Sequence, residues 1–217
     1  MAAIAPRKPP PPTVVLLVRH GQTPTTGQSL PGRAPGLHLA DAGVAQAEAV
    51  AARIAELRKV DAVYASPLER TRETAAPIAK ALKQRVKIDR GLLECDFGTW
   101  TGKKLKDLMK KPEWRTVQRY PSGFRFPSGE SFTEMQDRMT GTLAKLAERH
   151  RGKVIVAVSH ADPIKAAAAH ALGTHLDLFQ RIVISPCSVT AILYSADGPV
   201  VLAVNSITGS LATLAPS

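Results

Sequence analysis

The stretch Val14-Val15-Leu16-Leu17-Val18-Arg19-His20-Gly21 decides how this chain folds. Its five consecutive apolar residues predict a strand that is buried on both faces of a sheet. Arg19 and His20 follow where that strand ends, and ligands bind at this end of the strands in open α/β sheets. A strand that ends in Arg-His is common and not diagnostic by itself. The tripeptide gains meaning only from partners elsewhere in the chain.

A second histidine follows a second apolar strand. Residues 154–158 are apolar throughout, Ser159 and His160 end the run, and a helix is predicted over 163–172. We expect the two strands to be neighbours in one parallel sheet, which would bring His20 and His160 together.

A cationic helix start is predicted after the short strand 62–65. Ser66 is expected to cap a helix that begins at Pro67, with Glu69 completing a capping box. Arg70 would then lie in the first turn, where free backbone N–H groups and the helix dipole already favour an anion. The alternative interpretation of Arg70 is an ordinary exposed helix residue.

Three carboxylates could carry acid–base chemistry. Glu94 and Asp96 lie in a turn-rich stretch after the strand 86–88. Asp162 follows the second histidine and is interpreted as a helix-start residue.

Together these segments resemble the signature of the histidine phosphatase superfamily, the phosphoglycerate mutase-like group. That signature contains Arg-His-Gly after the first strand, Ser-x-x-x-Arg-x-x-x-Thr-Ala at a helix start, a Glu before a turn and a late His at a strand end. All of these motifs occur here in family order, between about Thr13 and about Asn205. The resemblance implies hydrolysis of a small phosphomonoester through a phosphohistidine intermediate, with no cofactor and no metal.

The resemblance also implies a role for each site residue. His20 would be the nucleophile. Glu94, preferred over Asp96 because it holds the family position, would protonate the leaving oxygen and then activate water. Arg19, Arg70 and His160 would surround the phosphoryl oxygens. The predicted catalytic residues are thus His20, Glu94, Arg19, Arg70 and His160. The predicted substrate-binding residues are Arg19, Gln22, Thr26, Arg70, His160 and Ala161.

The choice between phosphatase and mutase favours the phosphatase. The mutase pattern has an Asn where this chain has Thr26, a Tyr where it has Phe97, and an adjacent arginine pair where Arg115 and Arg119 stand apart. A phosphoglycerate mutase-type activity remains the alternative. The segment 175–189 resembles α-ribazole-phosphatase-like members and phosphomutases of unknown substrate, and does not choose between a cobalamin-pathway phosphatase and a broad phosphomonoesterase.

The predicted fold is a three-layer αβα sandwich with a mixed, mostly parallel six-stranded sheet. Strands are expected near Val14, Val63, Val86, Val154, Val189 and Val201, the last two joined as a hairpin at 196–199. Helical periodicity over 41–57 places Val44, Ala47, Ala51 and Ile54 on one face, and over 131–149 it does so for Phe132, Met135, Met139, Leu143 and Leu146. Residues 13–217 are predicted as a single domain after a Pro-rich flexible tail, 1–12.

The net charge of +11 has two interpretations. The segment 102–125 holds eight basic and two acidic residues. It could steer anionic substrates as a basic rim of the pocket, or it could be a solvated helix face. A competing class is an anionic-ligand or nucleic-acid binding protein on a phosphatase fold. No aromatic stacking set or binding motif supports it, so nucleic acid is not expected. A catalytically dead scaffold is disfavoured because all the signature residues are present.

Cysteine content and the N-terminal sequence suggest a compartment. Cys95 and Cys187 make no disulfide framework, which favours a reducing cytoplasm. Arg7-Lys8 followed by four prolines is unlike a signal peptide, and no apolar run is long enough to span a membrane. The expected partner is a small-molecule phosphomonoester, and the sequence predicts no oligomeric state.

Overall fold

The structure, a computed structural model, describes residues 10–214, so residues 1–9 of the predicted tail lie outside the described residues. One sheet has the strand order β3-β2-β4-β1-β5-β6. The strands are β1 (Thr13–Arg19), β2 (Ala62–Ala65), β3 (Val86–Ile88), β4 (Val154–Ser159), β5 (Val189–Ser195) and β6 (Gly198–Ser206). The α-helices are α1 (Asp41–Ala55), α2 (Glu69–Ala81), α3 (Leu105–Leu108), α4 (Glu113–Arg119), α5 (Phe132–Arg149) and α6 (Ala161–Ala171). Short 3₁₀ turns are η1 (Arg90–Leu92), η2 (Gly98–Trp100), η3 (Pro121–Gly123), η4 (Leu176–Arg181) and η5 (Ala212–Leu214).

The sheet is mixed and mostly parallel, as predicted. β1 pairs in parallel with β4, so that Arg19 lies opposite Ser159. On its other side β1 pairs antiparallel with β5, and β5 and β6 form the predicted hairpin. The two strands that end in histidine are therefore neighbours.

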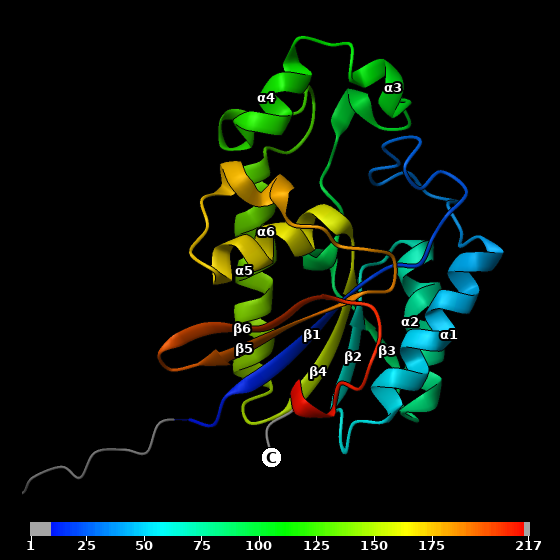
Figure 1. Cartoon of the computed structure of the whole chain (residues 1–217), viewed down its shortest axis with the longest axis vertical. Helices are drawn as coiled ribbons and strands as arrows, with labels where there is room; N and C mark the ends of the chain where they lie inside the picture. The colour runs from blue at the N-terminus through cyan, green and yellow to red at the C-terminus, as the bar shows by residue number, and fades with distance from the viewer. Residues whose placement is uncertain (1–9, 215–217) are drawn as a thin grey trace, which may run out of the picture.

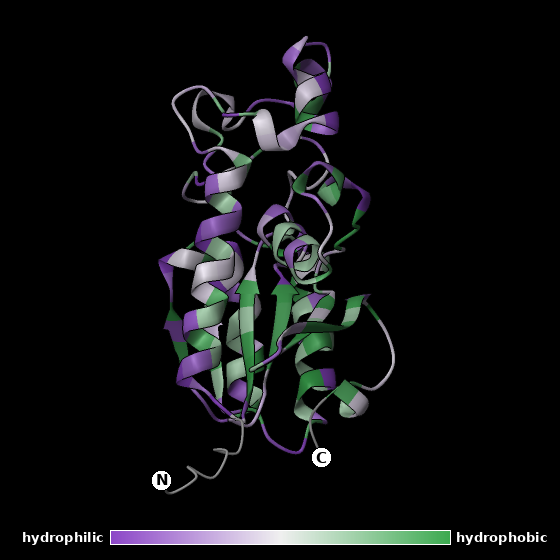
Figure 2. Ribbon diagram, turned by 90° about the vertical axis from the view of Figure 1, so that its left-hand side faces the viewer, coloured by the Kyte–Doolittle hydropathy of each residue, from purple (hydrophilic) through white to green (hydrophobic). Residues whose placement is uncertain are grey.

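Helices cover both faces of this sheet (Figure 1). Val14, Leu16 and Val18 pack on α1 and α2, whereas Val15 and Leu17 pack on α5 and α6. Successive side chains of a strand point to opposite faces, so a strand covered on both sides needs an unbroken apolar run. Figure 2 shows this apolar centre between helices of mixed hydropathy. The predicted αβα sandwich is confirmed.

Helix α1 differs in detail from its prediction. It ends at Ala55, and Val44 is 47% exposed, whereas Gly43 and Val50 join the buried face. The prediction that Val44 faces the core was wrong, because the buried face of α1 is centred on Gly43, Val50 and Ile54 and Val44 lies at its margin. Helix α5 has all five predicted apolar residues buried, and Ser131 and Glu134 form a capping box at its start.

Residues 98–130, called the cap below, lie above the carboxyl ends of the parallel strands (Figure 1). The cap contains α3 and α4 and has an apolar cluster of its own. Phe124 and Phe126 pack there with Trp100, and Phe132 of α5 stacks edge-on against Phe179 of η4. Because this cluster packs the cap against α5 and η4, the basic segment 102–125 has a defined position above the carboxyl ends of the strands.

The described end of the predicted tail lies against the turn after α5. The backbone N–H of Gly152 donates to the carbonyl of Pro11 at 3.2 Å. Among residues 10–214, no helix is long and apolar enough to cross a membrane.

Candidate active site

The loop after β1 places His20 against the end of β4. The His20 backbone N–H donates to the Ser159 carbonyl at 3.0 Å. The rings of His20 and His160 then meet edge to face, with centroids 5.3 Å apart. Gly21 lets this loop approach α1 closely, because a Cβ there would lie 2.5 Å from the carbonyl oxygen of Gly43.

His20 is held as a neutral imidazole with a free Nε2. Its Nδ1 lies 2.7 Å from the Gly21 carbonyl, which can only accept, so Nδ1 carries the proton and Nε2 keeps its lone pair. Burial, together with the positive charges of Arg70 and Arg19, lowers the pKa of His20 to about 3, although the hydrogen bond to Gly21 acts in the opposite direction. The nucleophile predicted from the sequence is therefore in its reactive form over the whole neutral range.

Two guanidinium groups flank the histidines, one partly buried on Arg19 and one fully buried on Arg70. Arg70 is fully buried, and its Nη2 donates to the Gly32 carbonyl at 2.8 Å. Arg19 donates from Nη1 to the Ile184 carbonyl at 2.6 Å. Burial lowers the pKa of both arginines, while the Glu94 carboxylate raises it. Among the described residues, Nε of Arg19 and both Nε and Nη1 of Arg70 are buried without a hydrogen-bond partner. Such orphaned cationic donors are costly in a folded protein unless an anion completes them.

Ser66 does not cap a helix, so that prediction was wrong. Helix α2 begins at Glu69 with Leu68 at its N-cap position, and the Ser66 hydroxyl instead lies 2.9 Å from Nε2 of His160. The Ser–Arg–Thr spacing of the motif thus serves the site directly: Thr74, one turn after Arg70, accepts a hydrogen bond from the Gly21 backbone N–H at 3.0 Å.

His160 is fully buried and neutral. Burial lowers its pKa well below the usual value, and the charges of Arg70 and of the neighbouring His20 act in the same direction. The structure therefore favours a neutral ring that donates one N–H over a protonated ring. Its Nδ1 is also buried without a partner among residues 10–214.

Glu94 is a buried carboxyl group next to the two arginines. It is 7% exposed, and its Oε1 accepts a hydrogen bond from the Cys95 backbone N–H at 2.9 Å. Burial and the nearby Asp162 carboxylate raise the pKa of Glu94 to about 7, against the opposing charges of Arg70 and Arg19. Asp96, the second candidate, has a side chain 41% exposed and faces Arg33. The structure therefore supports the choice of Glu94.

A charged network that the sequence analysis missed holds the Glu94 segment in place. Arg33 donates from Nε to the Glu94 carbonyl at 2.8 Å and from Nη2 to Glu130 at 2.9 Å. Arg138 of α5 donates to the same carboxylate and to the carbonyls of Gly91 and Leu93. No local pattern marks these residues, because loop and helix charges usually face solvent and these pairings span 8 to 97 positions along the chain.

A cavity of about 360 Å³ opens onto this group. Arg19, His20, Glu94, Thr26 and Ala161 line it, whereas Arg70 and His160 lie fully buried and outside its lining. Thr23, Lys165 and Gln180 are among the residues of its wall that could not be predicted from the sequence.

Gln22 does not line this cavity. Its side chain is exposed, and its backbone N–H donates to Gln46 at 2.9 Å. Thr23 lines the cavity in its place, so the cavity lining gives no support to the predicted substrate contact of Gln22. Residues 10–214 contain no group of three or more His, Cys, Asp or Glu side chains placed to hold a metal ion.

Comparison with known proteins identifies the family. The sequence profile of the histidine phosphatase superfamily (branch 1) matches residues 15–207, which is most of the chain. The chain belongs to branch 1 of the histidine phosphatase superfamily. The predicted family and the phosphoglycerate mutase-like fold are confirmed.

Relatives within this histidine phosphatase family include named phosphatases. The chain is 33% identical over 170 residues to phosphoserine phosphatase 1 of Hydrogenobacter thermophilus, covering 76% of this chain and 79% of that protein. It is 33% identical over 190 residues to bifunctional protein Rv2228c of Mycobacterium tuberculosis, covering 86% of this chain. The chain spans only 52% of the length of that second relative.

Solved histidine phosphatase structures share the fold. Phosphoserine phosphatase of Entamoeba histolytica, in complex with 3-phosphoglyceric acid, is 28% identical with a TM-score of 0.80, over 89% of this chain and 97% of that one. The α-ribazole phosphatase of Shigella flexneri is 24% identical with a TM-score of 0.78, over 90% and 97% of the two chains. The second likeness concerns the fold alone.

Proposed function

We propose that this chain is a phosphomonoesterase that moves the phosphoryl group of a small phosphorylated metabolite first to His20 and then to water. One observation carries the proposal. A buried imidazole with a free Nε2 lies among guanidinium nitrogens that lack partners, beside a carboxyl group that holds its proton near neutral pH. These are the nucleophile, the charge-stabilising donors and the general acid that phosphoryl transfer needs.

In the first step, Nε2 of His20 attacks phosphorus and the bond from phosphorus to the ester oxygen breaks. Glu94 gives its proton to that oxygen, which leaves as an alcohol. Arg19 and Arg70 neutralise the charge that spreads over the phosphoryl oxygens. His160 donates a single N–H to them; a Ser66 hydroxyl that donates to Nε2 would leave this proton on Nδ1.

In the second step, water attacks the phosphohistidine. Glu94, now a carboxylate, accepts the proton of the water, and the bond between phosphorus and Nε2 breaks to release inorganic phosphate. His20 returns to its neutral form with Nδ1 still bonded to Gly21. The cycle therefore restores both protonation states without any added group.

Hydrolysis is favoured over a mutase reaction. Thr26, at the position of the mutase asparagine, bonds to the Thr23 backbone N–H at 2.8 Å and so is engaged within its own loop. The names of the two phosphoserine phosphatases described above support the same choice. Phosphoserine and 3-phosphoglycerate, which appear in those names, are the first substrates to try.

The test is phosphate release from a panel of phosphorylated metabolites by wild-type and His20→Ala protein. The panel includes phosphoserine, 2- and 3-phosphoglycerate and α-ribazole phosphate. Release from one or a few compounds that is lost in the variant would support the proposal. Interconversion of the phosphoglycerates without free phosphate would replace it with a mutase, and no turnover at all would favour a binding role.

A further inference from the structure

A second cavity adjoins the active-site cavity. It has a volume of about 630 Å³ and is lined by Thr25, Gly27, Gln28, Ser29, Gly102, Lys104, Leu105, Lys106 and Met109. Thr25, Gly27, Ser29 and Leu105 line both cavities. The two spaces are therefore neighbours across a common wall and not separate features of the surface.

That wall is built by backbone pairing between two distant segments. The loop 25–30 and the cap segment 102–105 run antiparallel, with an isolated bridge between Ser29 and Lys104. The backbone N–H of Leu30 donates to Lys103 at 3.0 Å, and that of Leu105 donates to Gln28 at 2.8 Å. Figure 1 shows this loop beside α3 at the top of the molecule.

Two glycines keep the second cavity open. Gly27 and Gly102 have φ values of +75° and +79°, which only glycine adopts freely, and no atom lies within 4 Å of where a Cβ would stand. Larger residues there would strain the turns and narrow the space.

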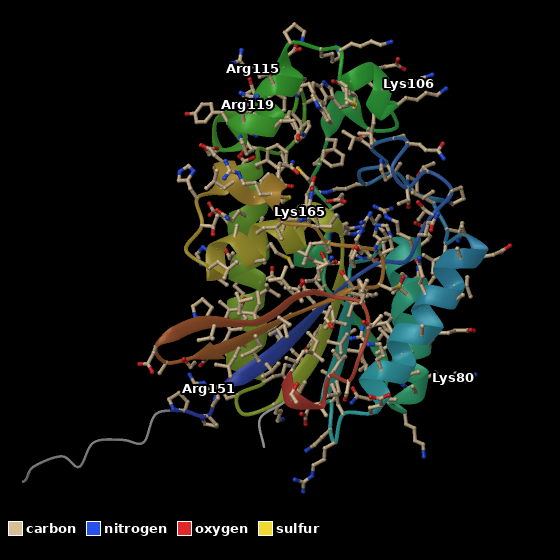
Figure 3. The ribbon with its side chains drawn as sticks, in the orientation of Figure 1. Lys80, Lys106, Arg115, Arg119, Arg151 and Lys165 are labelled. Atoms are coloured by element: carbon tan, nitrogen blue, oxygen red, sulfur yellow. The ribbon has the colours of Figure 1, made fainter. Side chains whose placement is uncertain are left out.

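The second cavity is positively charged. Lys104 and Lys106 are exposed, and neither forms an ion pair in the part of the chain that the structure describes. No carboxylate lines the cavity, since Asp107 turns away to Lys110 at 3.4 Å. Leu105 and Met109 add apolar surface beside the two lysines. Figure 3 shows Lys106 on α3, above Lys165 in the centre of the molecule.

We propose that this cavity is a substrate subsite for phosphomonoesters whose leaving group ends in a second anionic group, a phosphate or a carboxylate. The proposal rests on the phosphatase function above. The scissile phosphate would lie at His20, the body of the leaving group would pass over the exposed edge of the shared wall beside Leu105, and its far anion would meet Lys104 and Lys106. The cationic rim then selects substrates by contact and not only by long-range attraction.

The test compares hexyl phosphate with hexane-1,6-diyl bisphosphate and with the matching ω-carboxyhexyl phosphate. Wild-type protein should show a lower KM for both probes that carry a second anionic group than for hexyl phosphate. In Lys104→Met/Lys106→Met protein, the KM for the bisphosphate should rise about fivefold to tenfold, as expected for two exposed ion pairs. Its kcat and its KM for hexyl phosphate should stay within about twofold.

Lys110→Met/Lys111→Met is the matched control, because it removes the same charge from the cap outside both cavities. It should leave the bisphosphate KM nearly unchanged. If both double variants raise the KM for the bisphosphate equally, the lysines act through the general electrostatic field of the cap and the subsite proposal is overturned. The proposal is also overturned if wild-type protein has the same KM for the bisphosphate and for hexyl phosphate. If the Lys104→Met/Lys106→Met changes raise the KM for the bisphosphate but not for the ω-carboxyhexyl phosphate, the subsite accepts a phosphate and not a carboxylate.

Binding separates the subsite from the proposed function. Calorimetric titration of the bisphosphate into His20→Ala protein needs no turnover. If wild type hydrolyses none of the probes, the phosphatase proposal fails. The subsite is then judged by whether the Lys104→Met/Lys106→Met changes, added to His20→Ala, weaken this binding; unchanged binding would overturn it.

Discussion

At the scale of residues, burial lowers the pKa of His20 and raises the pKa of Glu94, and both shifts favour the neutral form of the side chain. Removal from water disfavours the charged form of each group, so His20 loses its proton and Glu94 keeps its own. A neutral nucleophile and a protonated acid are the two states that the first transfer requires. Arg70, which stays cationic although fully buried, supplies the charge that a phosphoryl group would neutralise.

Glu94→Gln should slow hydrolysis of alkyl phosphates by about a hundredfold and of aryl phosphates much less, because only the poor leaving group needs a proton. With a pKa of about 7, Glu94 loses its proton as the pH rises through 7, so the wild-type rate on alkyl esters should fall there. Glu94→Gln protein should not show this fall in rate as the pH rises. Profiles of kcat/KM against pH for one ester of each kind measure both effects, and equal losses for the two esters would argue against Glu94 as the acid.

The same group should make stability depend on pH. The pKa of Glu94 is higher in the folded chain than in the unfolded one, so the folded state binds more protons and loses stability as the pH rises from about 4.5 to about 7. Glu94→Gln should remove that slope and be more stable than wild type at pH 8, by on the order of 1–2 kcal/mol. Urea titrations at pH 5 and pH 8 measure this; a variant that is less stable than wild type at both would contradict it.

At the scale of elements, the fold was largely predictable. The central strands β1 and β4 are buried apolar runs that end at polar residues, and α5 repeats apolar residues at helical spacing, so the local sequence pattern agrees with burial in these elements. The motif after β2 was predictable as a helix that carries Arg70. What local rules could not supply is the partner of Ser66, since His160 lies 94 residues away. Arg33, Glu130 and Arg138 were missed for the same reason.

Two helical glycines should respond in opposite ways to alanine. In Gly43→Ala of α1, the new Cβ would lie 2.0 Å from the Gln22 carbonyl oxygen, so the loop that carries His20 must move. Stability should fall by about 2 kcal/mol or more, and activity should fall with it. In Gly141→Ala of α5, nothing lies within 4 Å, and stability should rise by about 0.5–1 kcal/mol. Thermal unfolding of both variants tests whether Gly43 lies this close to the Gln22 backbone. Similar changes in Tm for the two variants would refute it.

At the scale of the whole molecule, sheet, helices and cap converge on one cavity. β1 and β4 bring the histidines, α2 brings Arg70, and the segment before the cap brings Glu94. The excess positive charge is concentrated on the cap, above the carboxyl edge of the sheet. An anionic ester thus meets a positive field before it meets the guanidinium groups inside.

Chelation should leave the rate unchanged. Guanidinium and imidazole donors meet the charge of the phosphoryl group, and Glu94 moves the proton, so no step in the proposed cycle depends on a metal-activated water. Wild-type activity after dialysis against EDTA should equal that of the untreated protein. A loss that added Mg²⁺ or Zn²⁺ restores would show that the cycle is wrong.

The most direct measurement of the central claim is capture of the phosphoenzyme. Wild-type protein mixed with its best substrate is quenched within milliseconds at alkaline pH, where phosphohistidine survives, then digested and sequenced by mass spectrometry. We predict a phosphoryl group on the peptide that contains His20, labile to acid and absent from His20→Ala protein. Phosphate release with no modified histidine at any time, or a phosphoryl group on another residue, would contradict the account.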